Sequence, residues 1–319
     1  MKKIISMLLI VLMVLSVLCA CQPNTEEPKV NEDEVLKILA IGNSHAVNAT
    51  SALYEVFKRE APDQKVVVGT LYYSGCKLEQ HVDFLTYNAN KYIYYKNTTG
   101  EWEKRTEATM LDALQDEQWD IVVMQEMNVQ SGTDTSFILG NIKIIQDYVL
   151  ENQPATPKFM WHMVWSNPTD EELMNTAPNS DSWKTSYGAY GKDSAKMFRE
   201  ISRCVQQYIL TDDTFVGVIP AATAIQYAND LLDMTDGELY RDYTHLSDLA
   251  YVMAAYTWYG TIAGVQSFDA LKLNVLPVHL RHGSNVALGD LTLTEEQQNM
   301  VLEAVNYALK TPYELPAQQ

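Results

Sequence analysis

Short, nearly continuous apolar runs that alternate with helical patterns constrain the fold of this chain more than any other feature. Residues 46–59, 107–115, 139–149 and 192–210 carry apolar side chains at helical spacing. The apolar runs lie before, between and after these segments, at residues 37–41, 65–71, 120–125, 158–164 and 215–219. Strands that are apolar on both sides are typical of a parallel sheet covered on both faces by crossover helices. The sequence therefore predicts an α/β fold with a roughly five-stranded parallel sheet.

Two further segments do not follow this alternation. Residues 91–105 have the pattern of a β-hairpin around the turn Asn97-Thr98-Thr99-Gly100, inserted before the third strand. Residues 166–191 are polar and rich in Asn, Ser, Pro and Gly, which predicts a long loop. Residues 247–262 are apolar nearly all round and predict a buried helix, and residues 294–309 predict a last amphipathic helix.

The first twenty residues have the features of a targeting segment. Lys2 and Lys3 precede an apolar run at residues 4–18, which is shorter than the ~20 residues that a membrane span needs. The run ends in Leu18-Cys19-Ala20-Cys21, which resembles the bacterial lipobox. That resemblance implies cleavage before Cys21 and diacylation of its sulfur. An ordinary signal peptide cleaved nearby and an uncleaved anchor are the alternatives.

The chain then divides into three parts. Residues 1–20 are expected to be a lipoprotein signal peptide. Residues 21–34 are polar and acidic and lack the apolar residues that would offset the entropy of ordering, which predicts a disordered tether. Residues 35–319 are long enough for one large domain. We therefore expect an exported protein that a lipid holds on the cell membrane, facing outside the cytoplasm.

Composition excludes some classes of partner. The formal net charge is −18, and no basic patch is present, which argues against binding to nucleic acid. No group of Cys, His and carboxylate residues has the spacing of a metal site, so neither a metal nor another cofactor is expected. Beyond the N-terminal segment only Cys76 and Cys204 remain, and the sequence leaves open whether they pair.

The first apolar run leads into Ile41-Gly42-Asn43-Ser44-His45, where a helical pattern begins. Ser44 is thus predicted at the carboxyl end of a parallel strand, where open α/β sheets bind ligands. A helix N-terminus there supplies free N–H groups and the positive end of the helix dipole. The competing interpretation is that Asn-Ser is only an ordinary helix cap.

A second candidate lies almost two hundred residues later, in Arg241-Asp242-Tyr243-Thr244-His245. An aspartate and a histidine three residues apart in a tight turn can lie on one side of it. The carboxylate then holds one imidazole nitrogen and leaves the other free to accept a hydroxyl proton. A purely structural turn is the alternative.

In this order, the Gly-x-Ser segment, a glycine turn after the second strand and a late Asp-x-x-His segment resemble the SGNH/GDSL hydrolase superfamily. The resemblance is nearest to a subgroup of bacterial lipoproteins with Gly-Asn-Ser at the first segment, and it covers residues 37–264. It implies a flavodoxin-like three-layer α/β/α sandwich. It also implies that Ser44 is the nucleophile, His245 the general base and Asp242 the orienting acid.

The same resemblance implies an oxyanion hole. Gly75, in Tyr73-Ser74-Gly75-Cys76-Lys77, would supply a backbone N–H beside that of Ser44. Where the superfamily commonly has Gly-x-Asn-Asp, this chain has Met124-Gln125-Glu126-Met127-Asn128. The side-chain amide of Asn128 is the favoured third donor, and that of Gln125 is the alternative.

Four other residues are candidates for the lining of the substrate cleft. They are His45, Glu79, His81 and Trp165, which follow the nucleophile, the glycine turn and the fourth strand. For His45, a place on the first turn of the helix is the competing interpretation, and for Trp165 it is a place in the core.

These features together predict a serine esterase that hydrolyses acyl esters, O-acetyl esters among them, on extracellular carbohydrate. The 19 Tyr and 6 Trp residues suit contacts with sugar faces, and the substrate class otherwise rests on analogy with the superfamily. A non-catalytic glycan-binding or interaction lipoprotein and a lipase or thioesterase are the alternatives.

Overall fold

The computed structural model of the protein describes residues 35–177, 187–272, 275–277 and 290–316. The expected signal peptide, Cys21 and the tether lie outside the described residues. Among the helices that are described, none is long and apolar enough to cross a membrane.

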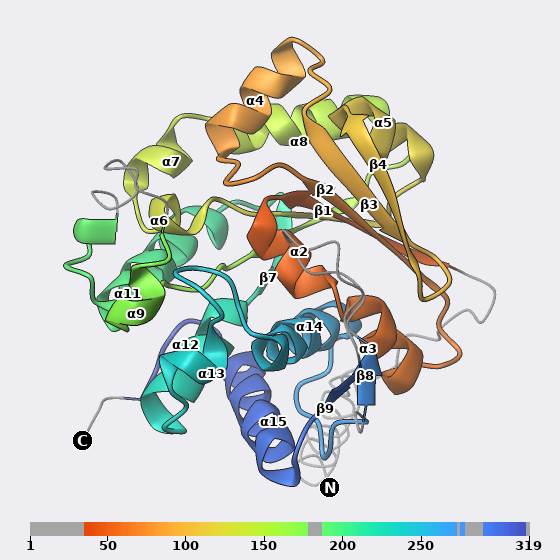
Figure 1. The fold of residues 1–319 in the computed structure, drawn as a ribbon. Helices are drawn as coiled ribbons and strands as arrows, with labels where there is room; N and C mark the ends of the chain where they lie inside the picture. Colours follow the sequence, from red (N-terminus) through yellow and green to blue (C-terminus); the bar gives the residue numbers. More distant parts are fainter. Residues whose placement is uncertain (1–34, 178–186, 273–274, 278–289, 317–319) are drawn as a thin grey trace, which may run out of the picture. The chain divides into compact units, whose positions relative to one another are not determined.

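A seven-stranded sheet with the order β4-β3-β2-β1-β5-β6-β7 forms the centre of the described domain (Figure 1). Its five parallel strands confirm the five that the sequence predicts, namely β1 (Leu36–Gly42), β2 (Val66–Tyr72), β5 (Ile121–Met124), β6 (Lys158–His162) and β7 (Phe215–Ile219). The predicted hairpin is also present, as β3 (Tyr92–Asn97) and β4 (Trp102–Ala108). It pairs antiparallel with β2 and so extends the sheet at one edge.

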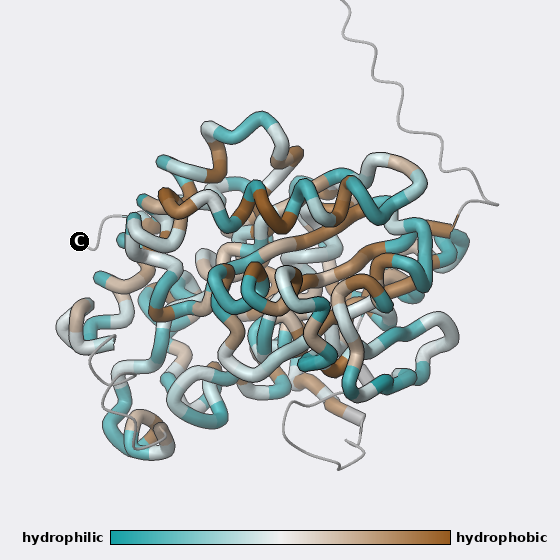
Figure 2. Tube along the Cα trace, turned by 90° about the horizontal axis from the view of Figure 1, so that it is seen from above, coloured by the Kyte–Doolittle hydropathy of each residue, from teal (hydrophilic) through white to brown (hydrophobic). Residues whose placement is uncertain are grey.

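Helices cover both faces of this sheet, as the resemblance implies. One apolar cluster lies beneath α2 (Ser44–Thr50), α3 (Leu53–Glu60), α12 (Ala221–Leu231), α14 (Asp248–Ala263) and α15 (Glu295–Lys310). A second cluster lies on the other face, beneath α4 (Leu78–Thr86), α5 (Met110–Asp116), α8 (Asn141–Asn152), α11 (Ser194–Cys204) and the π-helix η1 (Val205–Ile209). In Figure 2, hydrophobic strand segments run between helices whose outer faces are hydrophilic.

The remaining elements are short and belong to the loops. They are α6 (Asn128–Ser131), α7 (Asp134–Ile138), α9 (Glu171–Met174), α13 (Asp236–Leu239) and a small antiparallel sheet of β8 (Val275–Pro277) and β9 (Asp290–Thr292). The long polar loop predicted at residues 166–191 therefore contains at least one helix, α9.

Helix α14 fixes the segment that precedes it. Ser247 caps its first turn by accepting a hydrogen bond from Ala250 N, and Gly264, with φ of +71°, ends it. The residues between Leu249 and Gly260 are buried, as the sequence predicts. Because α14 is part of the core, the loop of residues 241–246 is attached to a rigid element and is held at the carboxyl edge of the sheet.

Candidate active site

Ser44 is the first residue of α2 and lies directly after the carboxyl end of β1. Asn43 caps the helix, because its Oδ1 accepts a hydrogen bond from His45 N at 3.0 Å. Ser44 is buried, with 6% of its surface exposed. A glycine is required at position 42, since a Cβ atom there would lie 2.8 Å from Cδ of Gln125. The absence of a side chain at Gly42 therefore leaves room for Gln125 where the chain passes from β1 to α2.

Asp242 and His245 form a hydrogen-bonded pair, as the resemblance implies. Asp242 Oδ2 lies 2.8 Å from His245 Nδ1. Asp242 Oδ1 accepts the backbone N–H groups of Thr244, at 3.0 Å, and His245, at 2.8 Å, and these bonds close the turn. Burial acts to raise the pKa of Asp242, but the hydrogen bonds and charge of His245 outweigh it and lower the pKa to about 2. The carboxylate is therefore ionised and holds the imidazole in one orientation.

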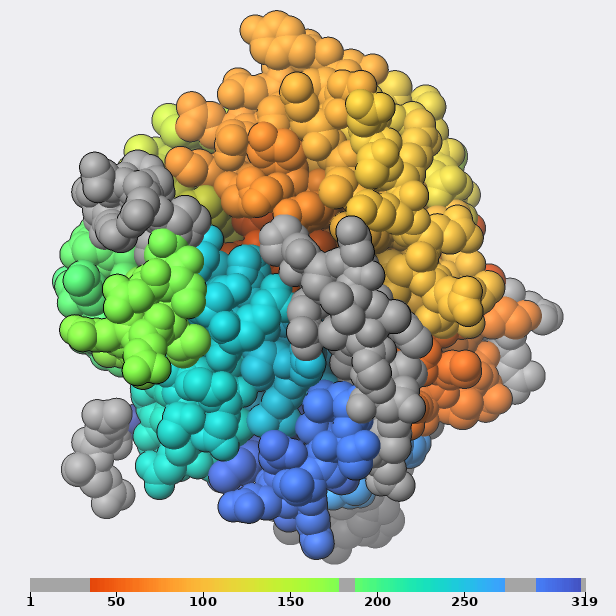
Figure 3. All heavy atoms as spheres, viewed as in Figure 1, coloured from red at the N-terminus to blue at the C-terminus, as the bar shows by residue number. Residues whose placement is uncertain are grey.

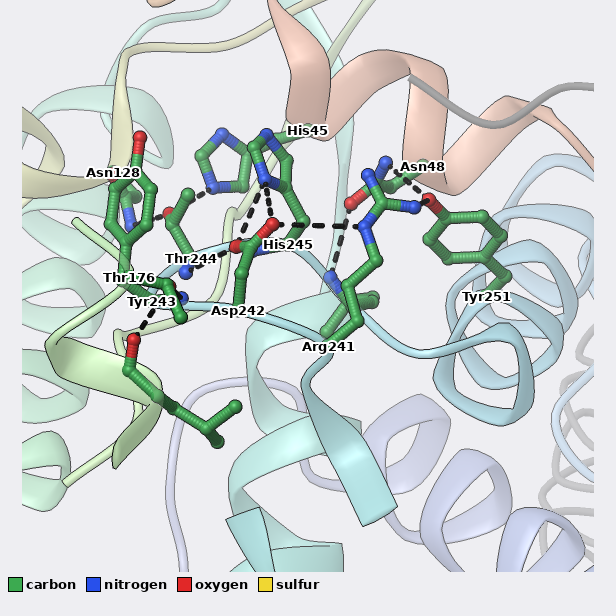
Figure 4. Close-up of polar contacts among 12 residues, drawn as sticks. His45, Asn48, Asn128, Thr176, Arg241, Asp242, Tyr243, Thr244, His245 and Tyr251 are labelled. Carbon is green, nitrogen blue, oxygen red and sulfur yellow. Dashed lines mark hydrogen bonds and ion pairs between the residues drawn. The ribbon is translucent and has the colours of Figure 1, made fainter. Parts of the chain in front are cut away.

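Ser44 and the Asp242–His245 pair meet at the same edge of the sheet. The ring of His45, the residue after Ser44, faces the His245 ring, with an angle of 28° between their planes and centroids 6.3 Å apart (Figure 4). Within the described part of the chain, Ser44 Oγ makes no hydrogen bond to His245. Catalytic hydrogen bonds are often long in ligand-free sites and shorten when substrate binds. The arrangement supplies a nucleophile candidate beside an oriented base.

His45 and Trp165 lie at this site, where both contact Thr244, the residue before His245. The nitrogens of His45 are 3.0 Å from Asn43 Oδ1 and 3.1 Å from Thr244 Oγ1. Trp165 is fully buried, packs against the His45 ring and donates from Nε1 to Thr244 O at 2.9 Å. Both residues therefore hold the loop that carries His245.

Glu79 and His81 lie on α4, on the other face of the sheet from α2. His81 is buried and stacks on Tyr92, with Nδ1 at 2.8 Å from the tyrosine hydroxyl. Burial lowers the pKa of His81 to about 3. Glu79 is exposed on the first turn of the helix. His81 thus lies in the core and not in the predicted cleft, and neither residue joins the group around Ser44.

Gly75 lies in an exposed turn after β2 and has φ of +60°, a conformation that glycine adopts without strain. Asn43 Nδ2 donates to Cys76 O at 2.9 Å, which fixes this turn beside Ser44. Among the residues that the structure describes, the backbone N–H groups of Ser44 and Gly75 have no acceptor. Two donors are thus available next to the candidate nucleophile.

The two amides proposed as a third donor have different surroundings. Gln125 Nε2 donates to Asn43 Oδ1 at 2.8 Å, and Gln125 Oε1 lies 3.0 Å from His162 Nδ1, so this side chain links two strands below the site. Asn128 Nδ2 donates to Asn167 Oδ1 and, at 3.0 Å, to Thr244 Oγ1. Asn128 therefore contacts the loop of His245, and Gln125 does not.

Sequence reasoning missed several residues that join these segments. Asn48 Oδ1 accepts from Leu246 N at 3.1 Å, and Asn48 Nδ2 donates to Tyr251 OH at 2.9 Å. Arg241 donates to the same hydroxyl and lies 3.7 Å from Asp242 Oδ2. The available signal was the spacing of Asn48, which is four residues after Ser44 and so on the same side of the helix. In Figure 3, orange, green and cyan parts of the chain, far apart in sequence, meet on the face shown.

Glu126 is a buried carboxyl group that ties the glycine turn to the loop of Asn128. Its Oε1 accepts from Met127 N at 2.6 Å and from Leu78 N at 3.2 Å. Burial raises the pKa of Glu126 from 4.5 to about 7, although these hydrogen bonds act to lower it. Folding therefore favours the protonated form of Glu126.

We expect Glu126→Gln to remove a pH dependence of stability. Because the folded pKa of Glu126 is raised, its contribution is present below pH 4.5 and is lost as pH rises towards 7. At about 1.4 kcal/mol per pKa unit, the loss in the wild type amounts to roughly 3 kcal/mol. Chemical denaturation of both proteins between pH 4.5 and 8 measures it. Parallel stability curves for the two proteins would contradict the prediction.

Cys76 and Cys204 are both buried and unpaired, which answers the question that the sequence leaves open. In the described ranges, no three His, Cys, Asp or Glu side chains are grouped so as to hold a metal ion.

The described domain is an α/β/α sandwich, with Ser44 and the Asp242–His245 pair at the carboxyl edge of its parallel strands. The chain belongs to the family described as "Domain of unknown function (DUF4886)", whose model matches residues 37–276. A crystal structure of a DUF4886 family protein from Bacteroides uniformis is 25% identical, with a TM-score of 0.69, and the match covers 88% of this chain and 97% of that chain.

Weaker matches include two proteins whose printed names give an activity. A GDSL-like lipase from Bacteroides thetaiotaomicron is 12% identical, with a TM-score of 0.39, over 70% of this chain and 85% of that chain. A family 3 carbohydrate esterase from Clostridium thermocellum is 11% identical, with a TM-score of 0.39, over 73% of this chain and 97% of that chain. Among curated proteins, a sequence search finds no match.

Proposed function

We propose that this protein is a serine esterase in which Ser44, His245 and Asp242 form the catalytic triad. One observation carries the proposal: an ionised Asp242 orients His245, and the loop of this pair is hydrogen-bonded to His45, the residue after a serine at a helix N-terminus. This is the set of groups that acyl transfer requires, namely a nucleophile, a base within reach and an acid that fixes the tautomer of the base.

In this mechanism, Ser44 Oγ attacks the carbonyl carbon of the ester while His245 Nε2 takes the hydroxyl proton. The tetrahedral intermediate collapses, and His245 returns the proton to the leaving alcohol, which leaves an acyl group on Ser44. A water molecule then attacks the acyl-enzyme with His245 again as base. The products are a carboxylic acid and the free enzyme.

The oxyanion is held by the backbone N–H groups of Ser44 and Gly75, which face no protein acceptor among the described residues. Asn128 is the proposed third donor, because its amide lies against Thr244, the neighbour of His245. It must then exchange one of its present acceptors for the substrate oxygen. Gln125 remains the alternative, but its amide is held between Asn43 and His162.

The proposed substrates are acyl esters, with O-acetyl groups on carbohydrate as the favoured class. Tyr243 supports this choice, since its half-buried ring lies edge-on to that of His245, the proposed proton donor to the leaving alcohol, with centroids 6.1 Å apart. Aromatic rings at such a position suit the apolar face of a sugar. Diacylation of Cys21, proposed from the N-terminal sequence, would place the enzyme on the membrane surface, with extracellular polymers as its substrates.

A fluorophosphonate probe tests the proposed function without a known substrate. The wild type should be labelled covalently, and Ser44→Ala should not be labelled, because the probe reacts with activated serines. Ser51→Ala is the matched control, since Ser51 lies just after the other end of α2 and should leave labelling unchanged. An unlabelled wild type would support the non-catalytic alternative, in which the fold binds glycan without hydrolysing it.

A further inference from the structure

We propose that Thr244 is a positioning residue, whose hydroxyl group holds His245 in register with Ser44. The proposal rests on the esterase function proposed above. Thr244 Oγ1 is the meeting point of two segments distant in sequence, because it lies 3.1 Å from His45 Nε2 and 3.0 Å from Asn128 Nδ2. In the sequence, Thr244 lies between Asp242 and His245, the acid and the base of the proposed triad.

The direction of each hydrogen bond follows from its neighbours. Asn43 Nδ2 donates to Cys76 O, so Asn43 Oδ1 is an acceptor, and the His45 nitrogen that contacts it, Nδ1, carries the proton. In the neutral imidazole, Nε2 of His45 is then an acceptor. The Thr244 hydroxyl therefore donates to His45.

Asn128 is the second hydrogen-bond partner of the Thr244 hydroxyl group. Its Oδ1 accepts from Val129 N at 2.9 Å, which identifies Nδ2 as the donor to Thr244. The hydroxyl group of Thr244 thus accepts from Asn128 and donates to His45. Because both its donor and its acceptor have defined partners, the side chain is confined to one orientation.

The backbone of Thr244 is fixed as well. Its N–H donates to Asp242 Oδ1 at 3.0 Å, and its carbonyl accepts from Trp165 Nε1 at 2.9 Å. With 5% of its surface exposed, Thr244 is too buried for bulk water to replace these partners. Together with the bond from Leu246 N to Asn48 Oδ1, the bridge to His45 relates the Asp242–His245 loop to α2, the helix that begins with Ser44.

This geometry matters because proton transfer from Ser44 to His245 requires an approach of ~2.6–3.2 Å. A displacement of about 1 Å in such a site can cost about 100-fold in rate. Loss of the Thr244 hydroxyl would remove the hydrogen bond between this loop and the buried His45 ring, which favours a shift of the loop. The effect should appear in kcat and not in substrate binding.

The test compares Thr244→Val, which keeps the shape of the side chain, with Thr244→Ser, which keeps the hydroxyl group. On a small acetate ester, Thr244→Val should lower kcat by about 10- to 100-fold with KM changed less than twofold, and Thr244→Ser should restore most of kcat. Thr176→Val is the matched control: its hydroxyl accepts from Tyr243 N in the same loop and donates to Leu173 O, and neither bond involves a triad side chain, so kcat should be unchanged.

Thermal unfolding of each variant separates positioning from stability. If Thr244→Val unfolds at assay temperature, the rate of fluorophosphonate labelling of Thr244→Ala, measured at lower temperature, takes its place. An active wild type whose Thr244→Val and Thr176→Val variants have equal kcat overturns this inference alone. A Thr244→Val variant that has lower thermal stability but wild-type kcat also overturns this inference. A wild type that neither hydrolyses esters nor reacts with the probe overturns the proposed function, and the inference with it.

Discussion

Replacing Asp242 by asparagine should lower kcat on a small acetate ester by about 10³- to 10⁴-fold, by comparison with other triads. The new side chain would retain an oxygen for the N–H groups of Thr244 and His245, so the turn should keep its shape. Its amide nitrogen would face His245 Nδ1, which would have to become an acceptor. The proton of the neutral imidazole would then lie on Nε2, where it blocks attack by Ser44.

Kinetics at saturating substrate measure this effect. Glu79→Gln is the control for the loss of one carboxylate, because Glu79 is exposed on α4 and away from the site. It should have the turnover of the wild type. If Asp242→Asn retained more than a tenth of wild-type kcat, His245 would not need its carboxylate partner, and the triad assignment would be wrong.

The second large effect is expected for Asn128→Ala, which should lower kcat by roughly 10²- to 10³-fold with little change in KM. An oxyanion donor stabilises charge that exists only in the transition state, so its loss does not weaken substrate binding. Gln125→Ala should lower thermal stability, because it leaves the buried His162 Nδ1 without its partner. It should change kcat less than Asn128→Ala does.

Asn128 also holds Thr244, and a double-mutant cycle separates the two roles. If Asn128 acts only through Thr244, then Asn128→Ala combined with Thr244→Val should lose no more activity than the more damaging single substitution. If Asn128 also donates to the oxyanion, the double variant should be less active than either. Near-wild-type turnover of both Asn128→Ala and Gln125→Ala would mean that the hole is formed by backbone N–H groups alone.

The sequence predicted the parallel strands, the hairpin and the buried helix α14, because each depends on a local pattern. It also predicted Ser44 at the carboxyl end of a strand, and the resemblance implied that the Asp242–His245 pair acts with it. The residues that join these segments could not be predicted in the same way. Thr244 and His45 are 199 positions apart, and their contact follows from packing of the whole core.

For His81, the sequence instead predicted a place in the site that the structure does not show. Its closeness to the glycine turn in sequence suggested a place in the cleft. The helical repeat of α4 instead turns it towards Tyr92 in the core. For His81, the side of the helix on which it lies therefore determines its location, and its closeness in sequence to the glycine turn does not.

The hairpin of β3 and β4 has a consequence for the behaviour of the protein at high concentration. Without it, β2, whose residues are buried throughout, would be the outermost strand of the sheet, with an apolar surface and unpaired backbone groups open to other chains. The strand that takes this place is β4, with exposed Glu103, Lys104 and Arg105. A second copy that paired with β4 would have to strip water from these charges, so this edge resists aggregation.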